Sequence, residues 1–324
     1  MNVDKNQSIF VAGATGMVGS AIVRNLKING FKNIFYTNRK QLDFTNKIQV
    51  YKYFKKYRFD QLYIAAAKVG GIKANNDYPV DFLLENISIQ TNLLSAAYEF
   101  KIKNVLFLGS SCIYPKHSKQ PIKEQYLLNG KLEETNEFYA IAKISGIKLC
   151  EAYNKQYLKN SNFEFRSIMP CNLYGIGDNY NPNQSHVIPA LIHKFHLAKK
   201  NNFQNVNVWG SGNAKREFLY VDDLANACIK FINLDKKYIK KKLNDYVSFI
   251  NVGSGQEITI KKLAYLIAEL VQFKGKILFN KNEHEGVNRK LLNNEMINRI
   301  GWRPTTSLKE GLKISYKDYL NSIL

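Results

Sequence analysis

Short apolar runs alternate with longer stretches of helical length over the first 175 residues. Apolar runs without polar interruptions are typical of strands that are buried on both faces of a parallel sheet. Parallel strands need crossovers, and these are nearly always right-handed. The pattern therefore predicts an α/β fold with a doubly wound parallel sheet. The expected strands are residues 9–14, 33–37, 61–67, 104–110 and 163–169, with helices over 17–29 and 82–100.

The pattern changes after Gly175, where a polar loop covers residues 178–185. The elements that follow are too mixed for a second unit of the same kind. We expect residues 215–255 to return to the sheet, while 176–214 and 256–324 form a smaller α/β lobe that binds substrate. The expected elements are a helix at about 186–200, strands at 206–210 and 249–253, and an amphipathic helix at 258–273.

Length and composition allow a large core, because 45% of the 324 residues are hydrophobic and 13% are aromatic. The first residues lack the basic head, apolar run and small-residue cleavage site of a secretory signal. The apolar runs are far shorter than the roughly 20 residues that cross a bilayer. We therefore expect a cytoplasmic protein with no membrane partner.

The net charge of +21 raises the question of a nucleic-acid partner. Much of the excess is lysine spread along the chain, with one dense run at residues 236–242. A solvated basic surface is the simpler interpretation, and it favours an anionic substrate without specifying one. We therefore expect no nucleic-acid partner.

The cysteines and histidines form no recognisable metal or disulfide pattern. The four cysteines are scattered and include no CxxC pair, which argues against a disulfide framework or a structural zinc site. His186, His193 and His196 could share one helical face, but no carboxylate or thiol pattern accompanies them. We therefore expect no metal.

A glycine-rich loop follows the first expected strand and opens the first expected helix. Gly13, Gly16 and Gly19 have the spacing of a dinucleotide-binding loop. In such a loop the first glycine permits a tight turn, the second lets the backbone approach a pyrophosphate, and the third lets the helix lie close to the strand. The alternative is a glycine-rich turn without a ligand. The strand before the loop and the helix after it favour binding, so residues 1–175 are predicted to form a Rossmann domain.

The end of the second expected strand bears on which dinucleotide binds. Sites that prefer NAD usually place Asp or Glu there, where it binds the ribose 2′-hydroxyl. Here Arg39 and Lys40 occupy that end, and the first carboxylate after the strand is that of Asp43. Arg39 could receive a 2′-phosphate instead, so we predict NADP(H) as the cofactor. The alternative is two exposed charges on a loop.

Tyr139 and Lys143 are four residues apart, a spacing that puts both on one face of a helix. A phenol alone is a poor acid–base group at neutral pH, because its unperturbed pKa is about 10. We expect the Lys143 ammonium to lower that pKa and to bind the nicotinamide ribose. Ser110 ends the fourth expected strand and could hold a substrate carbonyl beside the phenol. Together with the glycine loop, these residues predict a reductase.

Longer stretches of the chain resemble the GDP-L-fucose synthase family, a branch of the extended short-chain dehydrogenases/reductases. The motifs SSCIYPK and SHVIPAL are far more specific than the general motifs of the larger group. The shared stretches are GMVGSAI (16–22), AAAKVGGI (65–72), FLGSSCIYPK (107–116), YAIAKISGIKLC (139–150), NLYG (172–175), SHVIPALI (185–192), WGSGNAKREFLYVDDLA (209–225) and GWRP (301–304).

The resemblance implies that the chain epimerises GDP-4-keto-6-deoxy-D-mannose at C3 and C5 and then reduces C4 with NADPH to give GDP-L-fucose. It assigns the epimerising acid and base to Cys112 and His186, and the proton for reduction to Tyr139, with Lys143 and Ser110 in support. The alternatives for the first two are a core-filling cysteine and a histidine that caps a helix.

The resemblance also implies where the ligands lie. The cofactor positions are Gly13, Ala14, Thr15, Gly16, Met17, Val18, Gly19, Arg39, Asp43, Leu108, Gly109, Ser110, Lys143, Pro170, Cys171, Asn172, Leu173 and His186. The substrate positions are Lys194, Trp209, Arg216 and Glu285.

Four positions depart from the family's pattern. Cys171 stands where a hydroxyl residue is usual, Lys194 where an Arg is usual, Glu285 where an Asp is usual, and Asn288 where a Pro is usual. Lys194 is a point charge and cannot copy the fork of an arginine. These departures bear on the identity of the sugar more than on the type of reaction.

Two other functions stay open. One is C4 reduction, with or without epimerisation, of a related GDP-keto-sugar such as a 6-deoxy-heptose. The other is an NADP-binding sensor without catalysis, although such proteins typically lack the tyrosine–lysine pair. The resemblance further implies a homodimer through the helices around residues 79–101 and 137–158.

Overall fold

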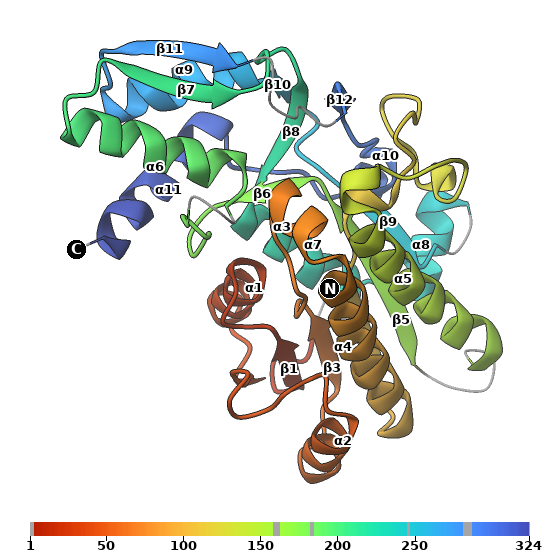
Figure 1. Ribbon diagram of the computed structural model, residues 1–324. Coiled ribbons are helices and arrows are strands. Elements are labelled where there is room, and N and C mark those ends of the chain that lie inside the picture. Colours follow the sequence, from red (N-terminus) through yellow and green to blue (C-terminus); the bar gives the residue numbers. More distant parts are fainter. Residues whose placement is uncertain (1–2, 158–162, 182–184, 245–246, 281–286, 324) are drawn as a thin grey trace.

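The computed structural model describes residues 3–157, 163–181, 185–244, 247–280 and 287–323. Six strands form one sheet in the order β2-β1-β3-β4-β5-β9, and every neighbouring pair is parallel. The chain runs from β1 out to β2 and returns to β3 on the other side of β1, so the switch point lies between β1 and β3 (Figure 1). The strands are β1 Ser8–Ala12, β2 Asn33–Phe35, β3 Gln61–Ile64, β4 Asn104–Leu108, β5 Glu164–Pro170 and β9 Phe249–Val252.

Helices pack on both faces of this sheet, which is why its central strands are mostly apolar and almost entirely buried. α1 packs against α7 on one face, and α4 packs between α2 and α5 on the other (Figure 1). The predicted doubly wound parallel sheet is confirmed. These helices are α1 Met17–Ile28, α2 Lys47–Lys56, α4 Pro79–Glu99, α5 Glu137–Tyr157 and α7 Val221–Ile232, and the short α3 Ile72–Asp77 precedes α4.

A second hydrophobic core lies in a smaller lobe, between the helices α6, α9 and α11 and the strands packed on them. Its larger sheet has the order β10-β8-β12 with β6 beside β8, and β7 pairs with β11. The lobe's elements are β6 Asn172–Tyr174, α6 Val187–Lys200, β7 Asn205–Trp209, β8 Lys215–Tyr220, β10 Glu257–Thr259, α9 Ile260–Val271, β11 Lys276–Asn280, β12 Arg289–Lys290 and α11 Leu308–Ser322. The remaining elements are η1 Ser111–Ile113, η2 Glu124–Tyr126, η3 Glu134–Asn136, α8 Lys236–Leu243 and α10 Glu295–Arg299.

Two expected elements differ in detail from the structure. Within 215–255, β8 lies in the smaller lobe, while α7 and β9 pack with the main sheet. The helix expected from residue 258 begins at Ile260, because Thr259 caps it by accepting a hydrogen bond from the Lys262 N–H at 3.1 Å. Residues 257–259 instead extend the sheet as β10, antiparallel to β8.

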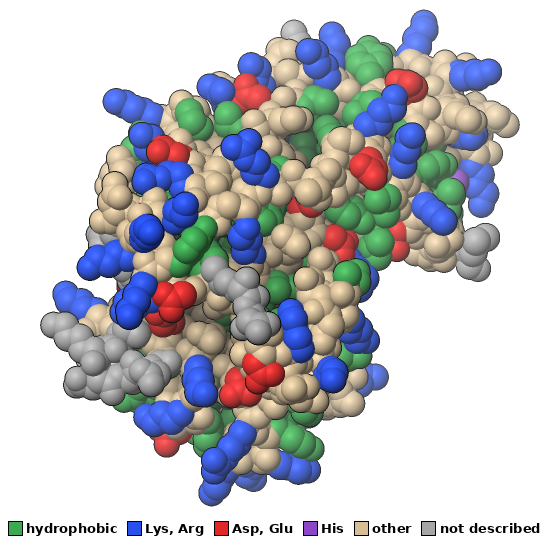
Figure 2. Space-filling view, turned by 180° about the vertical axis from the view of Figure 1, so that it is seen from behind, with side chains coloured by type: hydrophobic (Ala, Val, Ile, Leu, Met, Phe, Trp, Pro, Cys, Tyr) green, Lys and Arg blue, Asp and Glu red, His purple; other side chains and the backbone are tan. Residues whose placement is uncertain are grey.

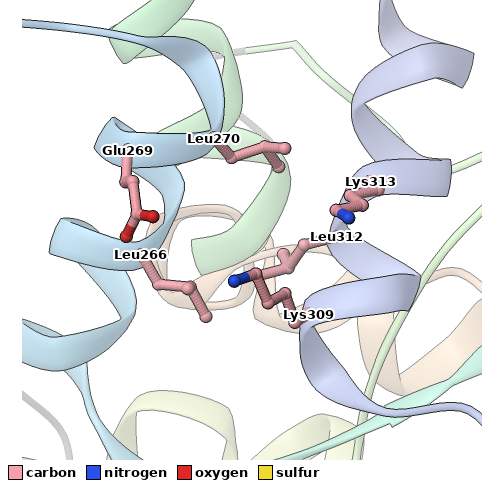
Figure 3. A pocket seen from close by; sticks show the side chains of 6 residues that line it. All are labelled: Leu266, Glu269, Leu270, Lys309, Leu312 and Lys313. Carbon is pink, nitrogen blue, oxygen red and sulfur yellow. The ribbon is translucent and has the colours of Figure 1, made fainter.

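On the face shown in Figure 2, the basic side chains of the described residues form no single dominant stripe. Figure 2 shows lysine and arginine side chains distributed over the visible face, with fewer acidic groups among them. A hollow of about 280 Å³ lies between α9 and α11, where Leu266, Leu270 and Leu312 form apolar walls (Figure 3). Over the described ranges, no helix is both long enough and apolar enough to cross a membrane.

A buried arginine links the middle of the sheet to the end of α7. Arg166 of β5 is 2% exposed and donates hydrogen bonds to the carbonyls of Phe231 and Leu234, at and beyond the last turn of α7. It also pairs with the Glu164 carboxylate on the same strand. The guanidinium therefore satisfies carbonyls that the helix cannot, at the end where its dipole is negative.

We expect Arg166→Met to lower the free energy of unfolding by about 3 kcal/mol or more, because it takes this buried donor from the Leu234 carbonyl and the Glu164 carboxylate. Urea unfolding measures this change. Arg24→Met is the matched control, since Arg24 pairs with Asp222 at 2.9 Å but its side chain is 32% exposed. Its cost should be about 1 kcal/mol. Equal losses in the two variants would contradict the argument.

Candidate active site

The glycine loop joins β1 to α1 at the switch point of the main sheet. Gly13 has a φ of +86°, and a Cβ there would lie 2.6 Å from the backbone nitrogen of Ala66, which follows β3. A Cβ on Gly19 would lie 2.1 Å from the Gly13 carbonyl oxygen. The packing of the protein itself therefore requires glycine at both positions.

Gly16 differs, because the protein leaves room for a side chain there. A Cβ on Gly16 would have the Gly13 oxygen as its nearest neighbour at 3.5 Å, which is an ordinary contact. Gly16 is the N-cap of α1 and provides no side-chain cap, and both Thr15 and Gly16 are exposed. The backbone N–H groups of an uncapped helix N-terminus are suited to a phosphate. The segment from Ala14 to Val18 thus fits a dinucleotide pyrophosphate.

The turn after β2 contains Arg39 and Asp43, which face different partners. The Arg39 guanidinium is exposed, and its Nη2 lies 3.4 Å from Glu85 Oε2 of α4. The Asp43 carboxylate accepts hydrogen bonds from the Thr45 backbone N–H at 2.9 Å and from its hydroxyl at 2.8 Å. The backbone bond is the main reason that the pKa of Asp43 is lower than usual. Asp43 therefore braces its own turn.

Lys143 is the buried centre of the predicted catalytic group. Its Nζ donates a hydrogen bond to the Leu108 carbonyl at 2.8 Å and lies 4.8 Å from the centre of the Phe107 ring. The residue is 3% exposed, and this desolvation lowers the pKa of Lys143 from 10.5 to about 7. Its ammonium therefore exchanges between charged and neutral forms close to neutral pH.

Tyr139 lies one turn before Lys143, with the ammonium 5.9 Å from the centre of its ring. Burial raises the pKa of Tyr139 well above its ordinary value, the Cys112 sulfur raises it further, and a hydrogen bond with Ser110 opposes them. The expectation that Lys143 lowers this pKa is wrong for this structure, because desolvation outweighs every other influence on the phenol. Tyr139 is therefore protonated at neutral pH.

Ser110 and Cys112 occupy the turn after β4. The Ser110 hydroxyl caps η1 and accepts a hydrogen bond from the Cys112 N–H at 3.3 Å. The Cys112 thiol is partly exposed, and Asn136 donates a hydrogen bond from Nδ2 to its sulfur at 3.6 Å. The sequence analysis missed Asn136, although its place three residues before Tyr139 was a usable signal. Ser110, Cys112, Tyr139 and Lys143 thus form one group.

A buried network holds the loop that carries Cys112. The Tyr114 hydroxyl donates to Asn251 Oδ1 at 2.5 Å, and the Asn251 N–H donates to Glu124 Oε1 at 2.9 Å. Asn251 also donates from Nδ2 to the Ile122 carbonyl at 2.9 Å. The sequence analysis did not identify these residues, because only tertiary packing brings them together from distant parts of the chain.

Residues 170–173 continue from β5 into β6. Asn172 donates from Nδ2 to the Glu217 carbonyl at 2.9 Å, which ties β6 to β8. The Cys171 thiol is buried, and desolvation raises its pKa well above the ordinary value. Cys171 is therefore an unreactive neutral thiol beside the expected cofactor site.

His186 is the residue at which α6 begins, but its side chain does not cap the helix. The imidazole is solvent-accessible and has no hydrogen-bond partner among the described residues. Nearby protein atoms still desolvate it in part, and this lowers the pKa of His186 below its ordinary value. The ring is therefore neutral near pH 7 and open to a ligand. His193 and His196 instead contact the hydroxyls of Tyr319 and Tyr316.

The predicted substrate residues lie on the smaller lobe. Trp209 ends β7 and is 57% exposed, so it is not part of the core. Lys194 of α6 places its ammonium 5.0 Å from the centre of the Trp209 ring and donates to the Asn207 carbonyl at 3.3 Å. Arg216 of β8 donates to the Lys215 carbonyl at 2.9 Å. Glu285 lies outside the described residues.

We expect the stability of the wild type to rise between pH 7 and 10.5, by up to about 1.4 kcal/mol per pH unit, because of Lys143. In this window the unfolded chain binds a proton that the folded chain has released. Lys143→Met removes that proton, so its stability should rise less steeply with pH than that of the wild type.

Urea unfolding at several pH values between about 7 and 9 measures the pH slope of stability in the wild type and in Lys143→Met. This range lies between the pKa of Lys143 in the folded protein and its ordinary value in the unfolded chain. Lys148→Met on the same helix is the control, because Lys148 is 45% exposed and pairs with Glu151. The same pH slope in wild type and Lys143→Met would show that Lys143 is not desolvated as described.

The chain is similar to known proteins over nearly its full length. It is 48% identical to a putative GDP-L-fucose synthase 2 of Arabidopsis thaliana, over 99% of this chain and 94% of that protein. It is 47% identical to GDP-L-fucose synthase of Escherichia coli, over 98% of this chain and 97% of that protein. Among solved structures, a GDP-mannoheptose C4 reductase from Campylobacter jejuni with NADP bound is 34% identical, with a TM-score of 0.88 over 98% of this chain and all of that one.

Residues 9–244 match the family described as NAD dependent epimerase/dehydratase. This match covers five of the six strands of the main sheet, the glycine loop and the group around Tyr139, and the full-length similarities extend it over β9 and over the rest of the smaller lobe. The chain therefore belongs to the NAD dependent epimerase/dehydratase family, in the branch that contains the GDP-L-fucose synthases.

Proposed function

We propose that this chain is an NADP(H)-dependent enzyme that converts GDP-4-keto-6-deoxy-D-mannose to GDP-L-fucose, by epimerisation at C3 and C5 and reduction at C4. The observation that carries the proposal is the position of Cys112. Its sulfur lies close enough to Tyr139 to raise the pKa of the phenol, so a thiol stands beside the reductase pair. A reductase alone has no use for that thiol, whereas an epimerase needs an additional acid or base.

NADP(H) is the cofactor that the site supports. The glycine loop offers an uncapped helix N-terminus, and Arg39 stands at the end of β2 where NAD enzymes carry an acid. A relative of similar fold has NADP bound. When bound, NADPH supplies the hydride for reduction at C4.

For the reduction, Ser110 and Tyr139 hold the C4 oxygen and Tyr139 gives it a proton. The raised pKa suits Tyr139 for this role, because a phenolate would have no proton to give. As the proton leaves, the ammonium of Lys143 stabilises the developing phenolate in a site of low dielectric. The C4 ketone becomes an alcohol, and the hydride and the proton account for both added hydrogens.

For the epimerisation, Cys112 and His186 act on the carbon atoms next to the ketone. A base removes the proton from C3 or C5, and the electron pair of that C–H bond moves into an enolate whose charge lies on O4. Ser110 and Tyr139 can stabilise this charge. An acid on the opposite face then returns a proton to carbon, so the configuration inverts without oxidation or reduction.

The GDP part of the substrate is assigned to the smaller lobe. Trp209 offers an exposed aromatic face, and Lys194 and Arg216 offer positive charge for the phosphates. The alternative reaction, C4 reduction of a GDP-heptose, is supported by the Campylobacter relative and by Lys194 in place of an arginine. A sensor without catalysis is disfavoured, because Ser110, Tyr139 and Lys143 lie together in an arrangement that can donate a proton.

We also propose that two copies pair through α4 and α5. These helices pack against each other and expose large apolar side chains that a monomer would leave in water. Val80 and Leu84 are exposed on α4, and Phe138 and Ile141 are exposed on α5. Pairing of two copies through these helices would remove apolar surface from water.

We expect Cys112→Ala to abolish the uptake of deuterium from D₂O at C3 and C5 of GDP-4-keto-6-deoxy-D-mannose. NMR of the recovered sugar without NADPH measures this exchange. His186→Asn should leave exchange with retained configuration or none, because protonation from the opposite face is lost. Cys112→Ala should still bind NADPH, since Cys112 belongs neither to the glycine loop nor to the other expected cofactor positions.

Tyr139→Phe provides the complementary variant, because it removes the proton donor and keeps the ring. We expect it to lose at least about 100-fold in reduction rate while retaining NADPH binding.

A panel of GDP-4-keto-sugars, each incubated with NADPH and the wild type, identifies the preferred sugar. Absence of deuterium in every sugar tested would leave only a C4 reductase, and Cys112 and His186 would have no catalytic role.

Leu84→Glu should convert the expected dimer to a folded monomer, because it places two like charges in an apolar interface. Sedimentation velocity measures the mass, and circular dichroism confirms that the fold is kept. Ile28→Glu is the matched control, since Ile28 on α1 is 80% exposed on the other face of the sheet. A monomeric wild type would exclude the proposed pairing.

A further inference from the structure

Four charged side chains form a cluster where the loops after β2 and β3 meet the start of α4. Glu85 is at its centre: its Oε2 lies 3.4 Å from Arg39 Nη2, and its Oε1 lies 2.9 Å from Lys68 Nζ. Lys68 also pairs with Asp81 at 2.7 Å. Glu85 is therefore shared between Arg39 and Lys68, whereas Asp81 contacts Lys68.

The cluster is held next to the glycine loop. Asn86 of α4 accepts a hydrogen bond from the Lys68 N–H at 2.9 Å and donates one to the Lys68 carbonyl at 3.0 Å. Two residues earlier, Ala66 lies against Gly13 at the switch point. The backbone around Lys68 is thus fixed, and Glu85 extends from the neighbouring position on α4 toward Arg39.

Glu85 supplies, from α4, the carboxylate that the end of β2 lacks. Arg39 is the residue placed to receive a 2′-phosphate, and a carboxylate 3.4 Å from it opposes a dianion at the same place. The cations of Arg39 and Lys68 are balanced by the carboxylates of Glu85 and Asp81, so the cluster has no net positive charge for the phosphate. A ribose 2′-hydroxyl carries no charge and meets no such repulsion.

We propose that Glu85 determines the cofactor specificity of this protein by weakening the binding of the 2′-phosphate of NADPH relative to the 2′-hydroxyl of NADH. The inference rests on the proposed function, because it takes the glycine loop and Arg39 as the cofactor site. Arg39 alone would favour NADPH over NADH. Glu85 would reduce this preference and is thus a residue that sets cofactor specificity.

Glu85→Gln tests the inference, because it removes the charge and keeps the shape. We expect the dissociation constant for NADPH to fall by about 3- to 10-fold. This is the size of the repulsion between a phosphate dianion and a single carboxylate that lie several ångströms apart near a protein surface. The constant for NADH should not fall. Titration of the purified protein with each cofactor, followed by the nicotinamide fluorescence, measures both constants without turnover. The gain for NADPH should shrink at high salt.

Asp81→Asn is the matched control, since it removes an equal charge from the same cluster without contact to Arg39. It should change the ratio of the two dissociation constants by less than Glu85→Gln does. Weaker NADPH binding by Glu85→Gln would show that Glu85 instead holds Arg39 in place, and it would overturn the inference. An unchanged ratio would overturn it as well.

Failure of the proposed function gives a different result. If the wild type binds neither cofactor, or if Arg39→Ala weakens NADPH and NADH equally, the cofactor site itself is misassigned and the inference falls with it. If the wild type binds both and Arg39→Ala weakens only NADPH, the site stands. The change in the two dissociation constants caused by Glu85→Gln then tests only the role proposed for Glu85.

Discussion

Parallel strands all end at one edge of their sheet, and the functional side chains of this protein depend on that constraint. Gly13 follows β1, Arg39 follows β2, Lys68 follows β3, Ser110 follows β4 and Asn172 follows the end of β5. The order of the strands reverses at β1, so the crossovers after β1 and β3 leave toward opposite faces of the sheet, and folds of this kind bind ligands at such a switch point. Residues separated by more than 150 positions in sequence, such as Gly13 and Asn172, therefore lie at the same edge of the sheet.

Within that edge, burial determines the chemistry more than charge pairing does. Desolvation lowers the pKa of Lys143 to about 7 and raises that of Tyr139, so each group is shifted toward its neutral form. A neutral phenol can give a proton to the substrate. The protonated form of the nearby lysine can then stabilise the phenolate that remains. The same helix, α5, carries both groups, and the Leu108 carbonyl fixes the lysine under the end of β4.

The sequence predicted the main sheet, because long apolar strands and the glycine spacing are local signals. It also predicted Ser110, Tyr139 and Lys143 as one group, because the position of a strand end and the period of a helix place them. It did not predict the direction of the pKa of Tyr139, since burial is a property of the whole fold. Asn251 and Glu124 stayed hidden for the same reason, as did Glu85, whose importance depends on the turn that brings Arg39 to it.

The two proposed reactions place negative charge on the same atom, and this explains how one site can perform both. Removal of a proton from C3 or C5 develops charge on O4 as an enolate, and hydride addition at C4 develops charge on O4 as an alkoxide. Ser110 and Tyr139 therefore need only one geometry to stabilise both species. An epimerase can arise from a reductase by adding groups that reach carbon, and Cys112 stands beside that pair, fixed by Ser110 and Asn136, without displacing either reductase residue.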